Sequence, residues 1–352
     1  MSLEHGFNQA WYQGKKWTQL FRPLLPLVSY YVKSKRKAYL QGDSASYRAP
    51  VPVIVVGNIT VGGTGKSPMV IALCQFLRVA GYRPGIISRG YGASATQVMA
   101  VHDGADPSIV GDEPMMLAKR TACPVVIGRQ RAQAAKMLLD NYDVNLIISD
   151  DGLQHYALTR DIEIVMLDQQ RGVGNGALLP VGPLREPIER LQSADFVVSA
   201  SQSQANLQNS LPACIAPLGL QNFHTLPLLA TQLVNLRSNE VADFALLKQQ
   251  KHWTVCAGIG NPQRFLDTLK GLGLGNNYTT LWWPDHHKIT VKDIPAKGPT
   301  IMTEKDAVKC HALAVANEDV WYLTIELTLT ELFKQTLMAS LSALSTCELN
   351  NK

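Results

Sequence analysis

The stretch of residues 53–68, VIVVGNITVGGTGKSP, combines a hydrophobic run with a glycine-rich loop that ends in a lysine and a serine. The β-branched run predicts a buried strand, and the glycines let the following backbone aim several N–H groups at an anion. Lys66 would add a positive charge for the β- and γ-phosphates of a nucleotide, and Ser67 would offer its hydroxyl to Mg²⁺. We therefore predict a nucleotide site formed by Thr60, Val61, Gly62, Gly63, Thr64, Gly65, Lys66 and Ser67.

The loop departs from the strict phosphate-binding pattern at one position. That pattern has a glycine five residues before Gly65, where this chain has Thr60. The pair Gly62 and Gly63 supplies backbone freedom instead, and the run 69–80 after the loop predicts a helix. A strand, this loop and a helix in that order favour a nucleotide site over an ordinary glycine-rich connection.

Three acids lie where predicted strands or helices begin or end. Asp150 and Asp151 close the apolar run 146–148, and ligands of parallel α/β sheets bind at the carboxyl ends of the strands. One of the two could hold Mg²⁺ opposite Ser67, while the ordinary alternative is that they cap a helix. Asp112 would by itself be a helix cap, but a kinase also needs a carboxylate that takes the proton of the acceptor hydroxyl.

Arginines follow two further predicted strands, with Arg89 after one and Arg129 and Arg131 after the other. Any of them could neutralise a transferring phosphoryl group or hold an anionic substrate. Residues 171–185 form a long loop rich in glycine and proline, and such loops are commonly functional. Its candidate substrate contacts are Arg171, Asn175 and Arg185.

A second group of polar residues lies near the end of the chain, at Asp285, His286 and His287. Adjacent histidines point in different directions, which disfavours a shared zinc ion and favours one catalytic or acceptor-binding histidine. The segment 303–306, TEKD, is similar to the guanine-reading pattern Asn-Lys-x-Asp, but its lysine is adjacent to the aspartate. It therefore does not indicate GTP.

The elements that must position these groups alternate between strands and helices, which predicts an α/β fold with a parallel sheet covered by helices on both faces. With 352 residues, of which 46% are hydrophobic and 17% charged, the chain is expected to be globular with two domains. Six scattered cysteines without zinc spacing indicate a reduced compartment. The predicted parts are an N-terminal arm (1–42), a P-loop NTPase-like kinase domain (43–215) and a smaller α/β domain (216–352).

The N-terminal arm carries the whole excess of positive charge. Residues 1–42 hold seven lysines and arginines against the single acid Glu4, whereas the entire chain has a formal charge of +5. Aromatic residues and leucines alternate with these cations, and the apolar part 23–32 is too short to span a membrane. We therefore predict a basic amphipathic segment on an anionic membrane surface. The alternative is an arm that packs on the domain and keeps its lysines in water.

Taken together, the motifs resemble the tetraacyldisaccharide 4′-kinase family, the lipid A 4′-kinases of Gram-negative bacteria. Their order and joint occurrence carry the resemblance, which extends from about residue 11 to 325. The matching segments are VPVIVVGNITVGGTGKSP, ISRGYG, GDEP, SDDGLQH, QQRGVGNGALLPVGPLREP, AGIGNPQRF, PDHH and MTEKDAVK. Thr60 in the loop is also found in this family.

The resemblance implies transfer of the γ-phosphoryl group of ATP to the 4′-hydroxyl of tetraacyldisaccharide 1-phosphate, which gives lipid IVA. It implies ATP and Mg²⁺, a lipid substrate, and a peripheral position on the cytoplasmic face of the inner membrane, without nucleic acid or an obligate protein partner.

The resemblance also implies roles for individual residues. Lys66 and Ser67 would bind the ATP phosphates and Mg²⁺, and Asp150 would be the metal ligand. Asp112 would be the catalytic base, assisted by His286 from the second domain. Asp151 would be a further catalytic residue beside the metal ligand, and Arg131 would steady the phosphates. Gln154 and His155, also beside the metal ligand, would bind the substrate, with Arg89 and Arg171 at the phosphate or sugars of the lipid.

Two other functions remain open from the residues alone. One is a P-loop kinase for a soluble small molecule, which would keep its activity without residues 1–40. The other is an ATPase that uses nucleotide as a membrane-attachment switch, because the segment 62–67, GGTGKS, also occurs in such proteins. Asp112 and the loop 171–185 favour an acceptor pocket instead.

Overall fold

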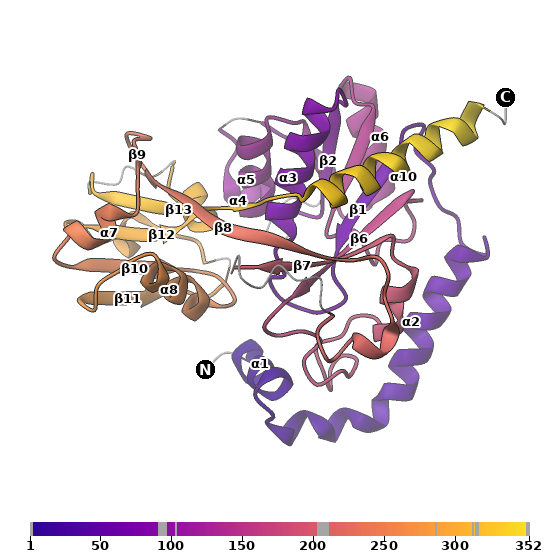
Figure 1. Ribbon diagram of the computed structural model, residues 1–352, viewed down its shortest axis with the longest axis horizontal. Helices are drawn as coiled ribbons and strands as arrows, with labels where there is room; N and C mark the ends of the chain where they lie inside the picture. Colours follow the sequence, from indigo (N-terminus) through magenta and orange to yellow (C-terminus); the bar gives the residue numbers. More distant parts are fainter. Residues whose placement is uncertain are drawn as a thin grey trace.

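In the described part of the computed structural model, 13 strands form one mixed sheet, and helices cover both of its faces (Figure 1). The structure describes residues 3–90, 97–102, 104–202, 211–285, 287–311, 313 and 317–349. From one edge to the other, the strands are β11 (Tyr278–Trp282), β10 (Trp253–Ala257), β12 (Thr300–Thr303), β13 (Val320–Leu327), β8 (Phe223–Asn235), β7 (Phe196–Ser201), β6 (Ile162–Asp168), β1 (Val53–Gly57), β5 (Leu146–Asp150), β2 (Pro84–Ser88), β4 (Val125–Ile127) and β3 (Met99–Val101), and the short β9 (Val241–Ala242) pairs with β8.

The helices connect these strands and also form the arm and the last segment of the chain. In chain order the α-helices are α1 (Leu3–Tyr12), α2 (Leu25–Leu40), α3 (Lys66–Val79), α4 (Pro107–Val110), α5 (Asp112–Thr121), α6 (Arg131–Asn141), α7 (Ala245–Gln249), α8 (Pro262–Gly271), α9 (Glu304–Cys310) and α10 (Glu331–Leu349). The 3₁₀ segments are η1 (Lys16–Leu24), η2 (Ile188–Ser193), η4 (Ala216–Leu218) and η5 (Val291–Asp293). We call β1 to β7 with α3 to α6 the P-loop half, and β9 to β13 with α7 to α9 the second half.

The two hydrophobic runs named above, at the start of 53–68 and at 146–148, form β1 and β5. In β1, β2, β5 and β6 every residue is buried, as expected for parallel strands that helices or loops cover on both sides. β1 pairs in parallel with β5 and β6, and β5 pairs in parallel with β2. The carboxyl ends of these neighbouring strands therefore meet at one edge of the sheet.

The predicted parallel sheet is a mixed one, and the difference is largest where the two halves meet. β8 is parallel to β7 but antiparallel to β13. β3 and β9 also run antiparallel to their neighbours, β4 and β8. The long β8 was not predicted, because its sequence contains Pro227 and mixes polar with apolar residues.

Separate hydrophobic clusters cover the two faces of the sheet. In the P-loop half, Leu73 of α3, Leu117 of α5 and Phe333 of α10 belong to one cluster, and α6 packs Leu138 into another. In the second half, α7 and α8 share one cluster, and α9 contributes to the other. Figure 1 shows α10 lying across the P-loop half, although it follows the last strand of the second half.

The predicted division at residues 215 and 216 stays a prediction. β8 begins beside β7 and ends beside β13, so the sheet continues across the two halves (Figure 1). α10 belongs to the predicted second domain by sequence and packs on the P-loop half.

The arm consists of α1, η1 and α2, and it lies along one side of the P-loop half (Figure 1). Leu25 and Val28 pack against the cluster beneath the loop 171–185, and the Trp11 indole donates a hydrogen bond to the Pro180 carbonyl at 3.1 Å. Large apolar side chains on the arm are nevertheless exposed, among them Leu20, Leu27, Tyr30 and Tyr31. Among the described residues, none of the helices combines the length and the hydrophobicity that a membrane span requires.

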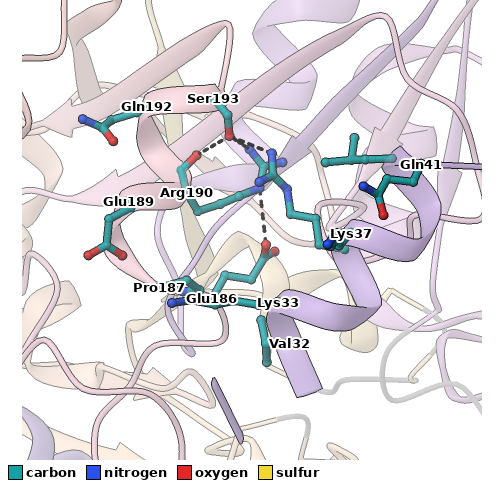
Figure 2. A pocket seen from close by; sticks show the side chains of 12 residues that line it. Val32, Lys33, Lys37, Gln41, Glu186, Pro187, Glu189, Arg190, Gln192 and Ser193 are labelled. Carbon is teal, nitrogen blue, oxygen red and sulfur yellow. Dashed lines mark hydrogen bonds and ion pairs between the residues drawn. The ribbon is translucent and has the colours of Figure 1, made fainter. Parts of the chain in front are cut away.

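A hollow with a volume of about 830 Å³ lies between α2 and η2 (Figure 2). Lys33, Arg36 and Lys37 of α2 line one side, and Glu189 and Arg190 line the other. Arg36 reaches across and donates a hydrogen bond to the Ser193 hydroxyl at 2.9 Å. The hollow therefore lies beside a hydrogen bond that already joins α2 to η2.

Candidate active site

The glycine-rich loop joins β1 to α3 and has the backbone of an anion-binding turn. Gly62 and Gly65 have φ angles of 108° and 86°, which residues with a side chain rarely adopt. Lys66 is the first residue of α3, so the loop ends at the positive end of a 14-residue helix. The Thr64 hydroxyl is buried, and the described part of the chain offers it no hydrogen-bond partner. A loop with this backbone and an unused hydroxyl fits a phosphate group.

Lys66 and Asp151 lie together at the carboxyl ends of the central strands. The ammonium group of Lys66 is 3.5 Å from the Asp151 carboxylate, and the Arg185 guanidinium is 3.2 Å from the same carboxylate. Burial raises the pKa of Asp151, but the charges of Lys66 and Arg185 outweigh burial and lower it to about 2. Asp151 is therefore ionised at neutral pH and orients the lysine of the loop.

Asp150 is 2% exposed, and Ser88 donates a hydrogen bond to its Oδ2 at 3.0 Å. Its Oδ1 is buried and has no hydrogen-bond partner in the described residues. Burial and the charges of Glu113 and Asp151 raise the pKa of Asp150 to about 7. An unpaired carboxylate oxygen beside the loop, with the hydroxyl of Ser67, provides the oxygen donors that Mg²⁺ prefers. These residues fit the predicted metal site.

Arg131 is held inside the P-loop half rather than exposed at its edge. It is 2% exposed, and its guanidinium donates hydrogen bonds to the backbone carbonyls of Gly128 at 2.7 Å and Asp150 at 3.0 Å. Burial lowers the pKa of Arg131 to about 10. These contacts fix the backbone that carries Asp150, and contact of Arg131 with phosphate stays a prediction.

The residues predicted to bind the substrate surround Asp151 and the loop. Gln154 donates hydrogen bonds to the Asn58 carbonyl at 3.1 Å and to Glu186 at 2.8 Å. Burial and the nearby guanidinium groups of Arg131 and Arg89 lower the pKa of His155 to about 4, so this histidine is neutral at neutral pH. Arg89 itself is exposed at the end of β2.

Arg171 lies beside the glycine-rich loop. Its Nη1 is 3.6 Å from the position that a Cβ on Gly62 would take. Its guanidinium also lies over the Tyr12 ring, 5.2 Å from the ring centroid, so it connects the arm to the loop. The structure thus brings Arg171 next to the loop residues that were predicted to bind a nucleotide.

Asp112 is the first residue of α5, in the P-loop half. It is 5% exposed, and Gly111 rather than Asp112 is the N-cap of the helix. Two ammonium groups of α9 are near its Oδ2, Lys309 at 3.6 Å and Lys305 at 3.9 Å. The predicted base therefore lies on the P-loop half and contacts side chains of the second half.

His286 lies outside the described residues, so its predicted role stays a prediction. Its neighbours are described and lie near Asp112. Asp285 is 3.2 Å from the Lys305 ammonium group, and the backbone carbonyl of His287 accepts a hydrogen bond from Lys309 at 3.3 Å. The His287 ring is 3.5 Å from Asp293.

Several residues of the site were not predicted from the sequence. Ser88, Glu113 and Glu186 contact predicted residues only after folding, and no spacing marks them in the chain. Arg185 was predicted only as a candidate substrate contact within the long loop 171–185. The structure pairs it with Asp151. The two lysines of α9 carried a signal, because a spacing of four residues puts two side chains on one face of a helix.

Comparisons with known proteins agree on one family. A family model described as tetraacyldisaccharide-1-P 4′-kinase matches residues 17–342. A tetraacyldisaccharide 4′-kinase of Pseudomonas putida (strain W619) is 44% identical over 340 residues, 95% of this chain and 95% of that protein. One from Idiomarina loihiensis is 44% identical over 341 residues, 95% of this chain and 97% of that protein.

A crystal structure has the same fold as this chain. It is LpxK from Aquifex aeolicus, described as an "apo" form in complex with ATP, at 25% sequence identity. The match has a TM-score of 0.76 and covers 92% of this chain and 99% of that chain.

Proposed function

The chain belongs to the tetraacyldisaccharide-1-P 4′-kinase family, and on that premise we propose which of its residues carry the reaction. The reaction transfers the γ-phosphoryl group of ATP to the 4′-hydroxyl of tetraacyldisaccharide 1-phosphate, a step of lipid A biosynthesis. ATP is the donor and the lipid is the acceptor. One observation carries the assignment of roles: Lys66, at the first turn of α3, pairs with Asp151 at the end of the central strands.

On the phosphate side, the loop and the first turn of α3 bind the ATP phosphates. The N–H groups after Gly62 and Gly65 surround the anion, and Lys66 neutralises charge on the β- and γ-phosphates. Asp151 keeps the lysine in place, because a carboxylate with a pKa of about 2 remains charged through the reaction. Arg131 supports the same site by fixing the end of β5.

Ser67 and Asp150 would hold Mg²⁺. Bound there, the ion would neutralise charge on the phosphates during transfer. The support is Oδ1 of Asp150, which has no hydrogen-bond partner among the described residues, since a buried carboxylate oxygen without a partner is costly unless a cation binds it.

On the acceptor side, Asp112 takes the proton of the 4′-hydroxyl, and His286 assists it. The support for Asp112 is its position at the start of a helix, buried and facing the second half. Gln154, His155, Arg89 and Arg171 would contact the sugars or the 1-phosphate of the lipid. Arginines suit a phosphate group because a guanidinium binds it with two parallel hydrogen bonds.

The arm of residues 1–42 would bind the cytoplasmic face of the inner membrane. Its exposed leucines and tyrosines lie on a segment with seven cationic side chains, and this combination suits an anionic membrane surface. The acyl chains could then stay in the bilayer while the headgroup enters between the parts 43–215 and 216–352. Full extraction would expose many methylene groups, at about 0.8 kcal/mol for each.

The test is phosphoryl transfer from labelled ATP to tetraacyldisaccharide 1-phosphate in detergent micelles. The protein should label the lipid. Lys66→Ala should lower kcat/KM about a thousandfold, because the cation that neutralises the transferring phosphoryl group is lost. Lys136→Ala is a matched control, since Lys136 lies over the Tyr47 ring and outside the site. It should leave transfer unchanged.

Two results would contradict the proposal. Consumption of ATP without label in the lipid would indicate a switch ATPase or a soluble acceptor. Normal labelling by Lys66→Ala would remove the loop from the reaction.

A further inference from the structure

Two lysines of α9 share one face of a short helix in the second half. Thr303 caps this helix, with its hydroxyl accepting a hydrogen bond from the Asp306 backbone N–H at 3.2 Å. Lys305 and Lys309 are four residues apart, so both side chains leave the helix in the same direction. Their side chains are only 15% and 9% exposed. Burial of two ammonium groups is costly unless carboxylates pair with them.

The carboxylates that pair with these lysines come from both halves of the molecule. Lys305 is 3.2 Å from Glu113 and 3.2 Å from Asp285, and Lys309 is 2.9 Å from Asp306. Both lysines also approach Oδ2 of Asp112 within 4 Å, as described above. The α9 lysines thus stand between the start of α5 and the loop after β11.

The carboxylates around α9 need the ammonium groups of both Lys305 and Lys309 as counter-ions. Four carboxylates crowd this region, and they would repel one another without the two ammonium groups. Burial lowers the pKa of Lys305, but the charges of Glu113, Asp112 and Asp285 outweigh burial and raise it above its ordinary value. Lys305 therefore keeps its proton at neutral pH and remains a counter-ion for the cluster.

We propose that Lys305 and Lys309 are positioning residues of the phosphoryl transfer: they pair with the Asp112 carboxylate and orient it toward the acceptor hydroxyl. The inference rests on the proposed role of Asp112 as base. Lys309 also binds the backbone carbonyl of His287, and Lys305 binds Asp285. The two lysines therefore hold the Asp112 carboxylate, the Asp285 carboxylate and the His287 backbone in one arrangement, and they connect the second half to the chemistry.

The same helices supply a control for a purely structural role. Arg120, at the far end of α5, forms ion pairs with Glu304 of α9 at 2.8 Å and with Glu326 at 2.9 Å. Its side chain is 16% exposed, close to the 15% of Lys305. Eight residues separate Arg120 from Asp112, about 12 Å along the helix axis. Arg120→Met removes contacts between the halves without touching the base.

The experiment measures kcat for the lipid and, separately, the Kd of a fluorescent ATP analogue. Lys305→Met should lower kcat about tenfold and leave the Kd within about twofold, because only the acceptor side is disturbed. Lys305→Arg, which keeps the charge, should recover kcat to within about threefold of the parent. Lys309→Met should act in the same direction, measured on the fraction that urea unfolding shows to be folded. Arg120→Met should keep the parent kcat.

A double-mutant cycle with Asp112→Asn separates the two proposals. If the lysines act through Asp112, the effect of Lys305→Met on kcat should vanish in the Asp112→Asn background. An effect of undiminished size in that background would overturn the inference, as would an equal loss of kcat in Arg120→Met. Parent-like kcat in Asp112→Asn alone would instead remove Asp112 as base, and the inference would fail with it.

Discussion

The two ends of the site are assembled in different ways. The phosphate end, with Lys66, Asp150, Asp151 and Arg185, comes entirely from the P-loop half. The base end joins Asp112 of that half to Lys305 and Lys309 of the second half. The contacts of the first end lie within one half, whereas those of the second end join the two halves. We therefore expect binding of ATP and turnover of the lipid to respond to different substitutions.

The largest expected effect is at the phosphate end. Asp151→Asn should lower kcat/KM for ATP about a hundredfold, because Lys66 and Arg185 both lose their counter-ion. Asparagine tolerates the left-handed backbone of Asp151, with φ of 47°, so the fold should be retained. Steady-state kinetics at several ATP concentrations, with circular dichroism as a check on folding, measure this.

A matched substitution is Asp161→Asn, because Asp161 pairs with the exposed Arg48 away from the site. It should leave kcat/KM unchanged. A lower kcat with an unchanged KM for ATP in Asp151→Asn would contradict this prediction. Asp151 would then belong functionally to the base end.

An intermediate effect should appear as acid sensitivity of folding, caused by His155 near Asp151. The folded-state pKa of His155, about 4, lies below its ordinary value of 6.5, so the unfolded chain binds this proton first as the pH falls. Its contribution is present above pH 6.5 and is lost toward pH 4. Between pH 7 and pH 5 the free energy of unfolding should fall by about 2 kcal/mol on this account.

Urea unfolding of the parent and of His155→Gln at pH 7 and pH 5 measures this loss as a difference. Asp150 titrates in the opposite sense, because its raised pKa stabilises the folded state as the pH falls, and it contributes equally to both proteins. The exposed His252 gives a control, His252→Gln, which should behave like the parent. Equal pH dependence of parent and His155→Gln would contradict the prediction.

The smallest effect should come from a contact between the halves at the phosphate end. Arg264 of α8 is 2.9 Å from Asp168, which also accepts hydrogen bonds from the backbone N–H groups of Gln170 and Arg171. Because Asp168 keeps these donors, Arg264→Met should lower the free energy of unfolding by about 1 kcal/mol and change kcat less than about threefold.

Arg237→Met, which breaks an exposed ion pair with Glu318, should cost less than about 0.5 kcal/mol and serves as the comparison. A tenfold loss of kcat in Arg264→Met would mean that the second half also controls the phosphate end.

The difference between the phosphate end and the base end also explains which contacts could be predicted from the sequence. The loop, Asp150 and Asp151 follow hydrophobic runs, and the ends of parallel strands converge, so their proximity follows from local patterns. The ion pairs of Asp112 with Lys305 and Lys309 join residues almost 200 positions apart. Their proximity depends on the long strand β8, which was not predicted. The segment MTEKDAVK was used only for the guanine comparison and for the family resemblance, although its two lysines lie at helical spacing and reach the site. The order of β8 between β7 and β13 depends on packing that no local pattern records.

β8 also constrains how the P-loop half and the second half can move relative to each other. Residues 223–227 pair with β7, and residues 228–235 pair with β13. Since one hydrogen-bonded strand serves both halves, a rotation between them would deform this strand. The shared strand thus couples the two halves through backbone hydrogen bonds on both of its segments.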